Sequence, residues 1–147
     1  MFVEHHGDPV HSYLADSIQM VFDTLNDALL QPEGRPDKYD YCYSLAWIDG
    51  KPELWRGSLD PVFEKFHKDE KGKLVIKRTG QKTIYQMAIP MKDLSPFVAK
   101  EGGVMGFNFI INDNDGQGRK GWLGLSGGIG EGMNPQLYGH LVLVGEE

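Results

Sequence analysis

Alternation of apolar and polar residues, interrupted at short intervals by glycine, is the feature that most limits how this chain can fold. In DSIQMVFD, residues 16–23, Ile18, Met20 and Phe22 fall on one side of an extended chain, with Gln19 among the residues on the other. Glycine makes up 19 of the 147 residues, and it clusters between such runs, where tight turns need positive φ. The pattern therefore predicts short strands joined by tight turns.

The whole chain, residues 1–147, is predicted to be one all-β domain, an antiparallel and jelly-roll-like β-sandwich. Asp49-Gly50 is the favoured pair for a type I′ hairpin, from which KPELW returns, and a second hairpin is expected to turn at Thr79-Gly80. DTLNDALLQ and MKDLSPFV each predict no more than one helical turn, because prolines limit their length. Strands are expected near residues 16–23, 41–48, 74–78, 82–90, 105–112, 121–126 and 138–144.

Composition excludes several classes of function. A net charge of -6, without a basic stripe carrying interleaved aromatics, argues against a nucleic-acid partner. No apolar run approaches the roughly 20 residues of a membrane helix, so no membrane partner is expected. Cys42 is the single cysteine, which rules out an intrachain disulfide. No signal peptide is visible after Met1.

NDNDGQGRKGW, residues 112–122, has three interpretations. Its glycines spell G-x-G-x-x-G, but GWLGLSGG follows, where the dinucleotide fingerprint requires a helix. The EF-hand pattern fails because Ile111 stands at the first ligand position. A β-hairpin connection fits best, since Asn, Asp and Gly favour tight turns. A calcium site of another kind, using Asp113 and Asp115, stays open as an alternative.

No catalytic motif in this sequence has the surrounding structure or the partner residues that its chemistry requires. GLSGG matches G-x-S-x-G, but the nucleophile elbow requires a strand, a turn and a helix, and His140 is the only later histidine. The spacing of His5, His6 and His11 matches no standard metal site. No pair of carboxylates is fixed by a motif. We therefore expect no enzyme activity.

Aromatic residues are more informative. Trp47 falls on an apolar face and is expected in the core. Trp55 stands beside Arg56, Trp122 follows the predicted hairpin turn, and Tyr13 precedes the first strand. Exposed rings flanked by polar side chains suit sugars, because the C–H face of a pyranose stacks on a ring while polar groups bind its hydroxyls.

Five segments occur in the order that resembles the family 9 carbohydrate-binding modules and their DOMON-like relatives. They are DSIQMVFDTLND, YDYCYSLAW, TIYQMAIPMKDL, GFNFIINDNDGQGRKGWLGLSGGIG and NPQLYGHLVL. The resemblance covers about residues 3–144. It implies a β-sandwich that binds glycan without catalysis, usually appended to a secreted glycan-degrading enzyme. It also implies a sugar held between two tryptophan rings and calcium ions that stabilise the fold.

Only part of the family's site carries over. Tyr13 stands at the first aromatic position, Gln19 replaces an acidic residue that binds sugar hydroxyls, and Ser44 replaces an arginine. The second tryptophan is replaced, with Gly132 or Met133 near its position. The resemblance thus implies a weakened site, on the sheet face that carries Gln19, Ser44 and Ile110. The full set of expected sugar-binding residues is Tyr13, Gln19, Ser44, Trp55 and Arg56.

The resemblance also implies strands that would precede the DPVHS segment, and their lack is expected to leave a sheet edge uncovered. We therefore expect self-association through this uncovered N-terminal edge. Two functions stay open. The first is a secreted module that binds a plant-type polysaccharide or oligosaccharide. The second is a structural or assembly domain that has lost glycan binding.

Overall fold

The computed structural model describes residues 2–145, which contain nine strands and five short 3-10 turns. Seven strands form one sheet in the order β4-β3-β2-β1-β7-β8, with β9 also paired to β7, and β5 pairs with β6 separately. All of these pairs are antiparallel. The strands are β1 (Ser17–Asp23), β2 (Asp40–Ile48), β3 (Lys51–Ser58), β4 (His67–Lys68), β5 (Lys73–Thr79), β6 (Lys82–Ala88), β7 (Val104–Asn114), β8 (Arg119–Gly124) and β9 (Gly139–Val142).

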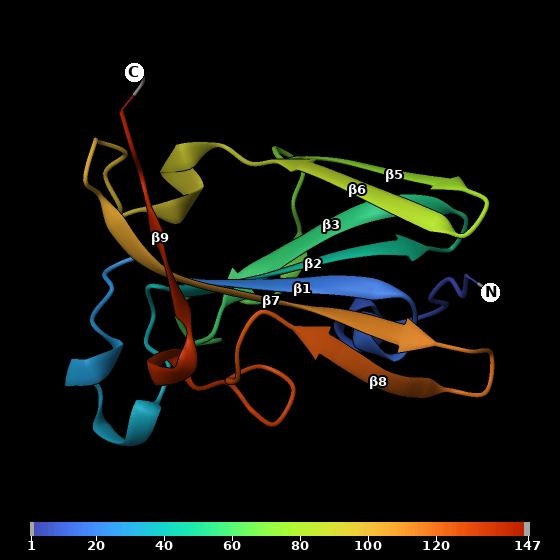
Figure 1. Ribbon diagram of the computed structural model, residues 1–147, viewed down its shortest axis with the longest axis horizontal. Coiled ribbons are helices and arrows are strands. Elements are labelled where there is room, and N and C mark those ends of the chain that lie inside the picture. The colour runs from blue at the N-terminus through green and yellow to red at the C-terminus, as the bar shows by residue number, and fades with distance from the viewer. Residues whose placement is uncertain (1, 146–147) are drawn as a thin grey trace.

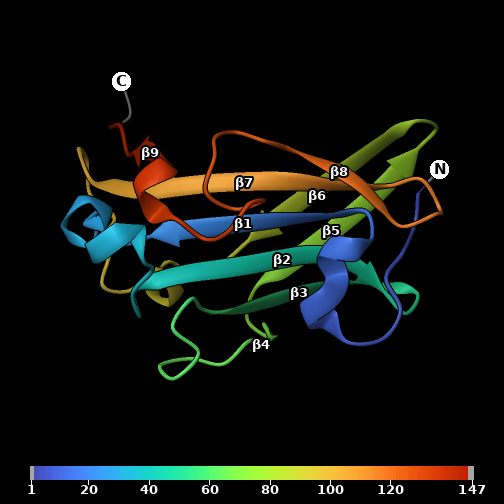
Figure 2. The same ribbon diagram turned by 90° about the horizontal axis from the view of Figure 1, so that it is seen from below.

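The two sheets form two layers, which confirms the predicted antiparallel β-sandwich. In Figure 1 the β5–β6 hairpin is the upper layer, above the seven-stranded sheet. Figure 2 looks at the opposite side of that sheet, where the 3-10 turn η1 (Pro9–Leu14) and the connection from β8 to β9 lie in front of the strands. We call the side under the hairpin the hairpin face and the other side the loop face.

The hairpin face carries the larger core. Alternate residues of β1, β2 and β3 pack there with the inward residues of the hairpin, because successive side chains of a strand point to opposite sides. Tyr43 and Leu45 have no exposed surface. The buried cluster consists of Ile18, Phe22, Tyr41, Tyr43, Leu45, Leu54, Leu94 and Met105, and Leu74, Tyr85 and Met87 of the hairpin pack against it.

The loop face is buried as well, although the alternation in the sequence predicts a polar, open face. Val21, Cys42 and Ile110 form a second cluster there with Ile129 and Tyr138 of the connection between β8 and β9. Burial raises the pKa of the Cys42 thiol to about 12, so this cysteine is an inert core residue. The strands are therefore covered on both sides over much of their length.

Turn chemistry explains how the strands are joined. Asp49 and Gly50 both have positive φ, of 46° and 85°, which confirms the predicted type I′ turn. The second hairpin turns one residue later than predicted, at Gly80 and Gln81, because Thr79 is still paired with Lys82. The NDNDGQGRKGW segment joins β7 to β8, which confirms the hairpin interpretation.

Helical structure is confined to single turns. Besides η1 these are η2 (Ala28–Leu30), η3 (Pro32–Gly34), η4 (Met91–Leu94) and η5 (Pro135–Leu137). The η2 and η4 turns confirm the two helical turns that the sequence predicts. Across residues 2–145, no helix has the length and apolar character needed to cross a membrane.

Candidate functional site

The η1 turn positions the first aromatic residue of the predicted site. The side chain of Asp8 caps η1 by accepting a hydrogen bond from the Val10 N–H at 3.0 Å. The turn packs against β1, β2 and β7 on the loop face. This arrangement holds Tyr13 half-buried at the end of η1, beside the strand that carries Gln19.

A buried asparagine joins Gln19 to the β7–β8 hairpin. The Asn112 amide group donates to Ser17 Oγ at 3.1 Å and to Gln19 Oε1 at 3.3 Å. The Asn112 carbonyl oxygen accepts from Arg119 Nε at 3.1 Å and from Nη2 at 2.7 Å. Asn112 is 2% exposed, so its hydrogen bonds form in a poorly solvated environment. They fix the positions of Gln19 and Arg119, both of which remain partly exposed.

Arg119 lies between two aromatic rings. Its guanidinium carbon is 5.5 Å from the ring centroid of Tyr13 and 4.6 Å from that of Trp122. Both distances suit a cation–π contact. Trp122 is 43% exposed. The loop face therefore presents a tyrosine, an arginine and a tryptophan side by side.

Trp122 and Arg119 are site residues that the sequence-based set omits. The register of the hairpin places Trp122 opposite Asn112, on the same side of the sheet as Gln19. Because the predicted hairpin pairs Trp122 with Asn112, the alternation of strand faces is the sequence signal that places Trp122 on the side of Gln19. Nothing in the sequence indicates that Arg119 folds back across the strand to contact Tyr13, because η1 is remote in the chain.

Ser44 is on the predicted face but is not open to a ligand. It is 3% exposed, and its Oγ is 2.7 Å from the Oγ of Ser12 on η1. Both serines line a hollow of about 200 Å³ between η1 and the β2–β3 strands, together with Gln19 and Phe66. Ile110 is 1% exposed and belongs to the core. Gln19 borders this hollow and also accepts a hydrogen bond from Asn112.

Trp55 lies on the same face, since it pairs directly with Ser44 across β2 and β3. Its ring stacks on Phe66 at 5.8 Å with an interplanar angle of 23°. Its Nε1 donates to Glu53 Oε2 at 2.8 Å. Burial works to raise the pKa of Glu53, but hydrogen bonds from Lys68, Trp55 and Lys51 outweigh burial and lower that pKa. Trp55 is therefore a second, separately held aromatic group on this face.

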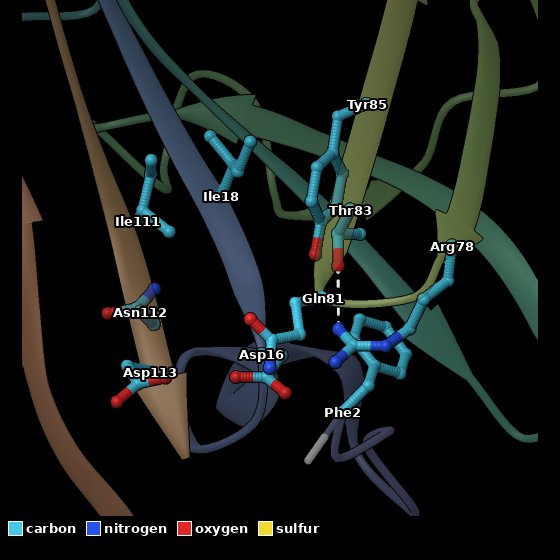
Figure 3. A pocket seen from close by; sticks show the side chains of 10 residues that line it. All are labelled: Phe2, Asp16, Ile18, Arg78, Gln81, Thr83, Tyr85, Ile111, Asn112 and Asp113. Carbon is cyan, nitrogen blue, oxygen red and sulfur yellow. Dashed lines mark hydrogen bonds between the residues drawn. The ribbon is translucent and has the colours of Figure 1, made fainter. Parts of the chain in front are cut away.

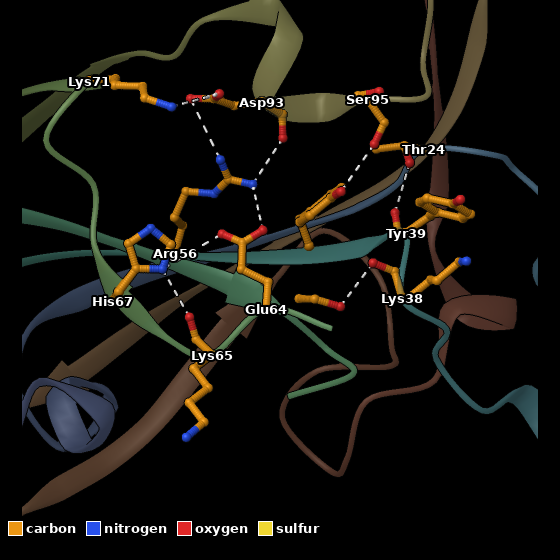
Figure 4. A network of polar contacts seen from close by, with 12 residues as sticks. Thr24, Lys38, Tyr39, Arg56, Glu64, Lys65, His67, Lys71, Asp93 and Ser95 are labelled. Carbon is orange, nitrogen blue, oxygen red and sulfur yellow. Dashed lines mark hydrogen bonds and ion pairs between the residues drawn. The ribbon is translucent and has the colours of Figure 1, made fainter. Parts of the chain in front are cut away.

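Arg56 points to the hairpin face, away from Trp55 and Ser44. Its Nη2 donates to Glu64 Oε2 at 3.2 Å and to the Asp93 carbonyl at 3.0 Å, as Figure 4 shows. Its guanidinium also lies over the rings of Tyr41 and Tyr43. Arg56 is 7% exposed. It joins β3 to η4 and does not share a surface with the other predicted sugar-binding residues.

Asp113 and Asp115 lie in and beside the β7–β8 turn. Asp115 Oδ1 accepts a hydrogen bond from the Gln117 N–H at 3.2 Å, which shapes the turn. Within residues 2–145, no group of three or more His, Cys, Asp or Glu side chains is arranged to hold a metal ion. The two carboxylates alone do not form a calcium cage, which takes 6–8 oxygen ligands.

Comparison with known proteins identifies the family. Residues 57–146, from the end of β3 onward, match the family described as carbohydrate family 9 binding domain-like. No curated protein and no solved structure matches the chain. The matched region contains the β7–β8 hairpin with Asn112, Arg119 and Trp122, and it covers more than half of the 147 residues. The chain therefore belongs to the carbohydrate family 9 binding domain-like family.

Proposed function

We propose that this protein is a non-catalytic module that binds a plant-type polysaccharide or oligosaccharide on the loop face. The observation that carries the proposal is the arrangement of Tyr13, Arg119 and Trp122 above the buried Asn112. Ring faces suit the C–H surface of a pyranose, and the adjoining polar groups suit its hydroxyls. Family membership supports the same ligand class.

The polar groups have defined roles in this proposal. Nε and Nη2 of Arg119 are engaged by Asn112, whereas its Nη1 has no protein partner within residues 2–145 and is available to a sugar oxygen. Gln19 is partly exposed, and because Asn112 donates to its amide oxygen, it offers its amide NH2 to a ligand. Because the arginine is held by a buried residue, it loses little side-chain freedom when a ligand binds. We expect an affinity of about 0.1–1 mM, roughly -4 to -5.5 kcal/mol.

The test is a titration with gluco-, xylo- and manno-oligosaccharides, followed by heteronuclear NMR. Shifts should cluster at the Trp122 indole and the Gln19 amide. Tyr13→Ala and Trp122→Ala should each remove on the order of 1–2 kcal/mol of binding free energy. Phe63→Ala is the matched control, because Phe63 is an exposed aromatic residue that packs with Tyr39 elsewhere. Gln19 amide shifts that survive both site substitutions unchanged would refute the loop-face site.

A non-catalytic role predicts that no reducing sugar is released from any of these substrates. Family members usually accompany secreted glycan-degrading enzymes, and we propose the same extracellular setting for this module. Release of sugar that depends on one carboxylate of the purified protein would contradict the binding-only assignment.

A structural or assembly role is the alternative, and two observations favour it. Ser44 is buried against Ser12, so the position of the family's arginine offers no ligand contact. Met133, near the position of the second tryptophan, packs against the loop-face core. Titrations without shifts for any glycan would support this second role.

A further inference from the structure

A pocket of about 620 Å³ opens on the hairpin face, on the opposite side of the sheet from Gln19. Figure 3 shows its two walls: β1 and β7 on one side and the tip of the β5–β6 hairpin on the other. The volume lies within the roughly 300–1,000 Å³ that small-molecule sites occupy. Charged, amide, hydroxyl and apolar side chains line it, among them that of Asn112, and all of them are labelled in Figure 3.

Several wall residues are held in place by the protein. Asp16 Oδ2 accepts from the Val3 N–H at 2.6 Å, and Oδ1 accepts from the Asn114 N–H at 3.0 Å. Arg78 Nη1 donates to Thr83 Oγ1 at 2.7 Å, and its guanidinium lies 5.3 Å from the ring centroid of Phe2. The pocket therefore has fixed positions for both a carboxylate and a guanidinium.

Three polar side chains in the pocket have no hydrogen-bond partner within residues 2–145: those of Asp113, Gln81 and Tyr85. Asp113 offers two acceptor oxygens, and Gln81 offers both a donor and an acceptor. Burial raises the pKa of Tyr85 to about 12, so its hydroxyl remains a donor. Between these groups lie the aliphatic side chains of Ile18 and Ile111 and the Tyr85 ring.

The charges in the lining indicate which ligands suit the pocket. Asp16 and Asp113 outnumber Arg78, which disfavours an acidic ligand. An unpaired carboxylate beside amide, hydroxyl and guanidinium donors suits neighbouring hydroxyl groups, while the ring and aliphatic surfaces suit C–H groups. We infer that this pocket is a second carbohydrate site, which takes a neutral, hydroxyl-rich sugar and lies on the other side of the sheet from the loop-face site, with only Asn112 in common. With sites on both sides of the sheet, one module can hold two glycan chains or two parts of one chain.

The experiment uses gluco-, xylo- and manno-oligosaccharides with methyl and indole NMR signals. Ile18 and Ile111 report on the pocket, and Trp122 reports on the loop face. Arg78→Ala and Asp113→Ala should each weaken binding at the pocket by about tenfold, the scale of a hydrogen bond to a charged group. Lys77→Ala and Asp115→Ala are the matched controls, because each removes the same charge from an exposed residue outside the pocket lining.

The two sites give separable results. In Trp122→Ala protein, the Ile18 and Ile111 shifts should persist, whereas the pocket variants should leave the Trp122 shifts unchanged. A glucuronate-terminated oligosaccharide should bind the pocket at least about tenfold more weakly than its neutral counterpart. Absence of sugar-dependent Ile18 and Ile111 shifts would overturn the inference while leaving the loop-face proposal intact, as would shifts that survive both pocket substitutions. Tighter binding of the acidic sugar would overturn the assignment to neutral sugars.

Discussion

Asp40 shows how a single residue can link this fold to pH. It is 2% exposed, at the start of β2. Burial raises its pKa to about 7, and the neighbouring carboxylates of Asp23 and Asp37 act in the same direction, while a hydrogen bond from the Asp37 N–H opposes them. Its folded-state pKa therefore lies above its ordinary value of 3.8. Between about pH 4 and 7, the folded protein therefore holds a proton on Asp40 that the unfolded chain releases.

We predict that Asp40→Asn flattens the dependence of stability on pH. A raised folded-state pKa contributes stability that is complete below the unfolded pKa and is lost as pH rises toward and through about 7. The difference in unfolding free energy between variant and wild type should therefore grow in the variant's favour from about pH 4 to 8, by on the order of 1 kcal/mol per pH unit at most. Urea denaturation across this range measures it, with the exposed Asp113→Asn as the control. Parallel curves for wild type and Asp40→Asn would contradict the prediction.

Asp115 in the β7–β8 turn is expected to act as a turn cap. Asp115→Ala should cost about 0.5 kcal/mol of unfolding free energy, because it removes the acceptor for the Gln117 N–H. We expect the same cost with and without calcium, as a turn-capping role requires. Thermal denaturation with calcium and with a chelator tests this. A calcium-dependent rise in melting temperature that Asp115→Ala abolishes would instead establish the calcium site that the sequence leaves open.

At the scale of elements, local chemistry predicts the strands, and long-range packing decides the site. Alternation and Asp49-Gly50 suffice to predict β1, β2 and the hairpin that joins β2 to β3. Adjacent residues of one strand point to opposite faces, so Trp55 and Arg56 could not share a site once β3 was predicted. The sequence alone therefore predicts that these two side chains are separated. The sequence does not predict that η1 covers Ser44, because this contact joins Ser12 and Ser44, which are 32 residues apart in the chain.

The connection between β8 and β9 positions Trp122, and we predict that Gly130→Ala disturbs the loop-face site. A methyl group at Gly130 would overlap the Trp122 indole. The ring must move, so glycan affinity on the loop face should fall by about tenfold, near the scale of one aromatic contact. Intrinsic fluorescence and NMR titration measure the two effects. Gly127→Ala is the control in the same connection, because its added methyl meets Leu137 at an ordinary 3.4 Å. Equal affinities for the two variants would show that Trp122 does not contact sugar.

The ion-pair network of Arg56, Glu64 and Asp93 between β3 and η4 is expected to stabilise the fold and to take no part in glycan binding. Arg56→Met leaves Glu64 and Asp93 without their buried cation and should cost about 3–5 kcal/mol of unfolding free energy. Adding Asp93→Asn to this variant should recover part of the loss, since it removes a buried charge that only the exposed Lys71, at 3.8 Å, still pairs with. Urea denaturation measures both changes. Glycan affinity on the loop face should not change in either variant. A loss of glycan affinity without a loss of stability would instead show that Arg56 contributes to sugar binding.

For the whole molecule, the predicted sandwich is confirmed, but its two layers differ in size. The hairpin layer consists of two strands facing seven. It is also basic, because residues 73–88 contain four lysines and arginines and no acidic residue, so the rest of the chain carries 11 - 21 = -10. Like charges therefore disfavour pairing between the hairpin layers of two molecules. The resemblance predicts an uncovered edge on the N-terminal side, whereas the strand order leaves β8 at one edge of the large sheet, since that order depends on pairing between distant segments.

Our last prediction is that the protein self-associates through β8, whose outer edge has no paired strand within residues 2–145. Leu123 is 73% exposed on this strand, beside Ile111 at 40%. Two β8 strands can pair antiparallel about a twofold axis, satisfying free N–H and C=O groups and burying apolar surface at roughly 25 cal/mol per Å². Sedimentation velocity should show a dimer that grows with protein concentration and disappears in Leu123→Lys, because a charge on the paired strand opposes burial. Leu137→Lys is the control, since Leu137 is 52% exposed but lies outside β8. A single monomeric species at every concentration, or a dimer that persists in Leu123→Lys, would rule out association through this edge.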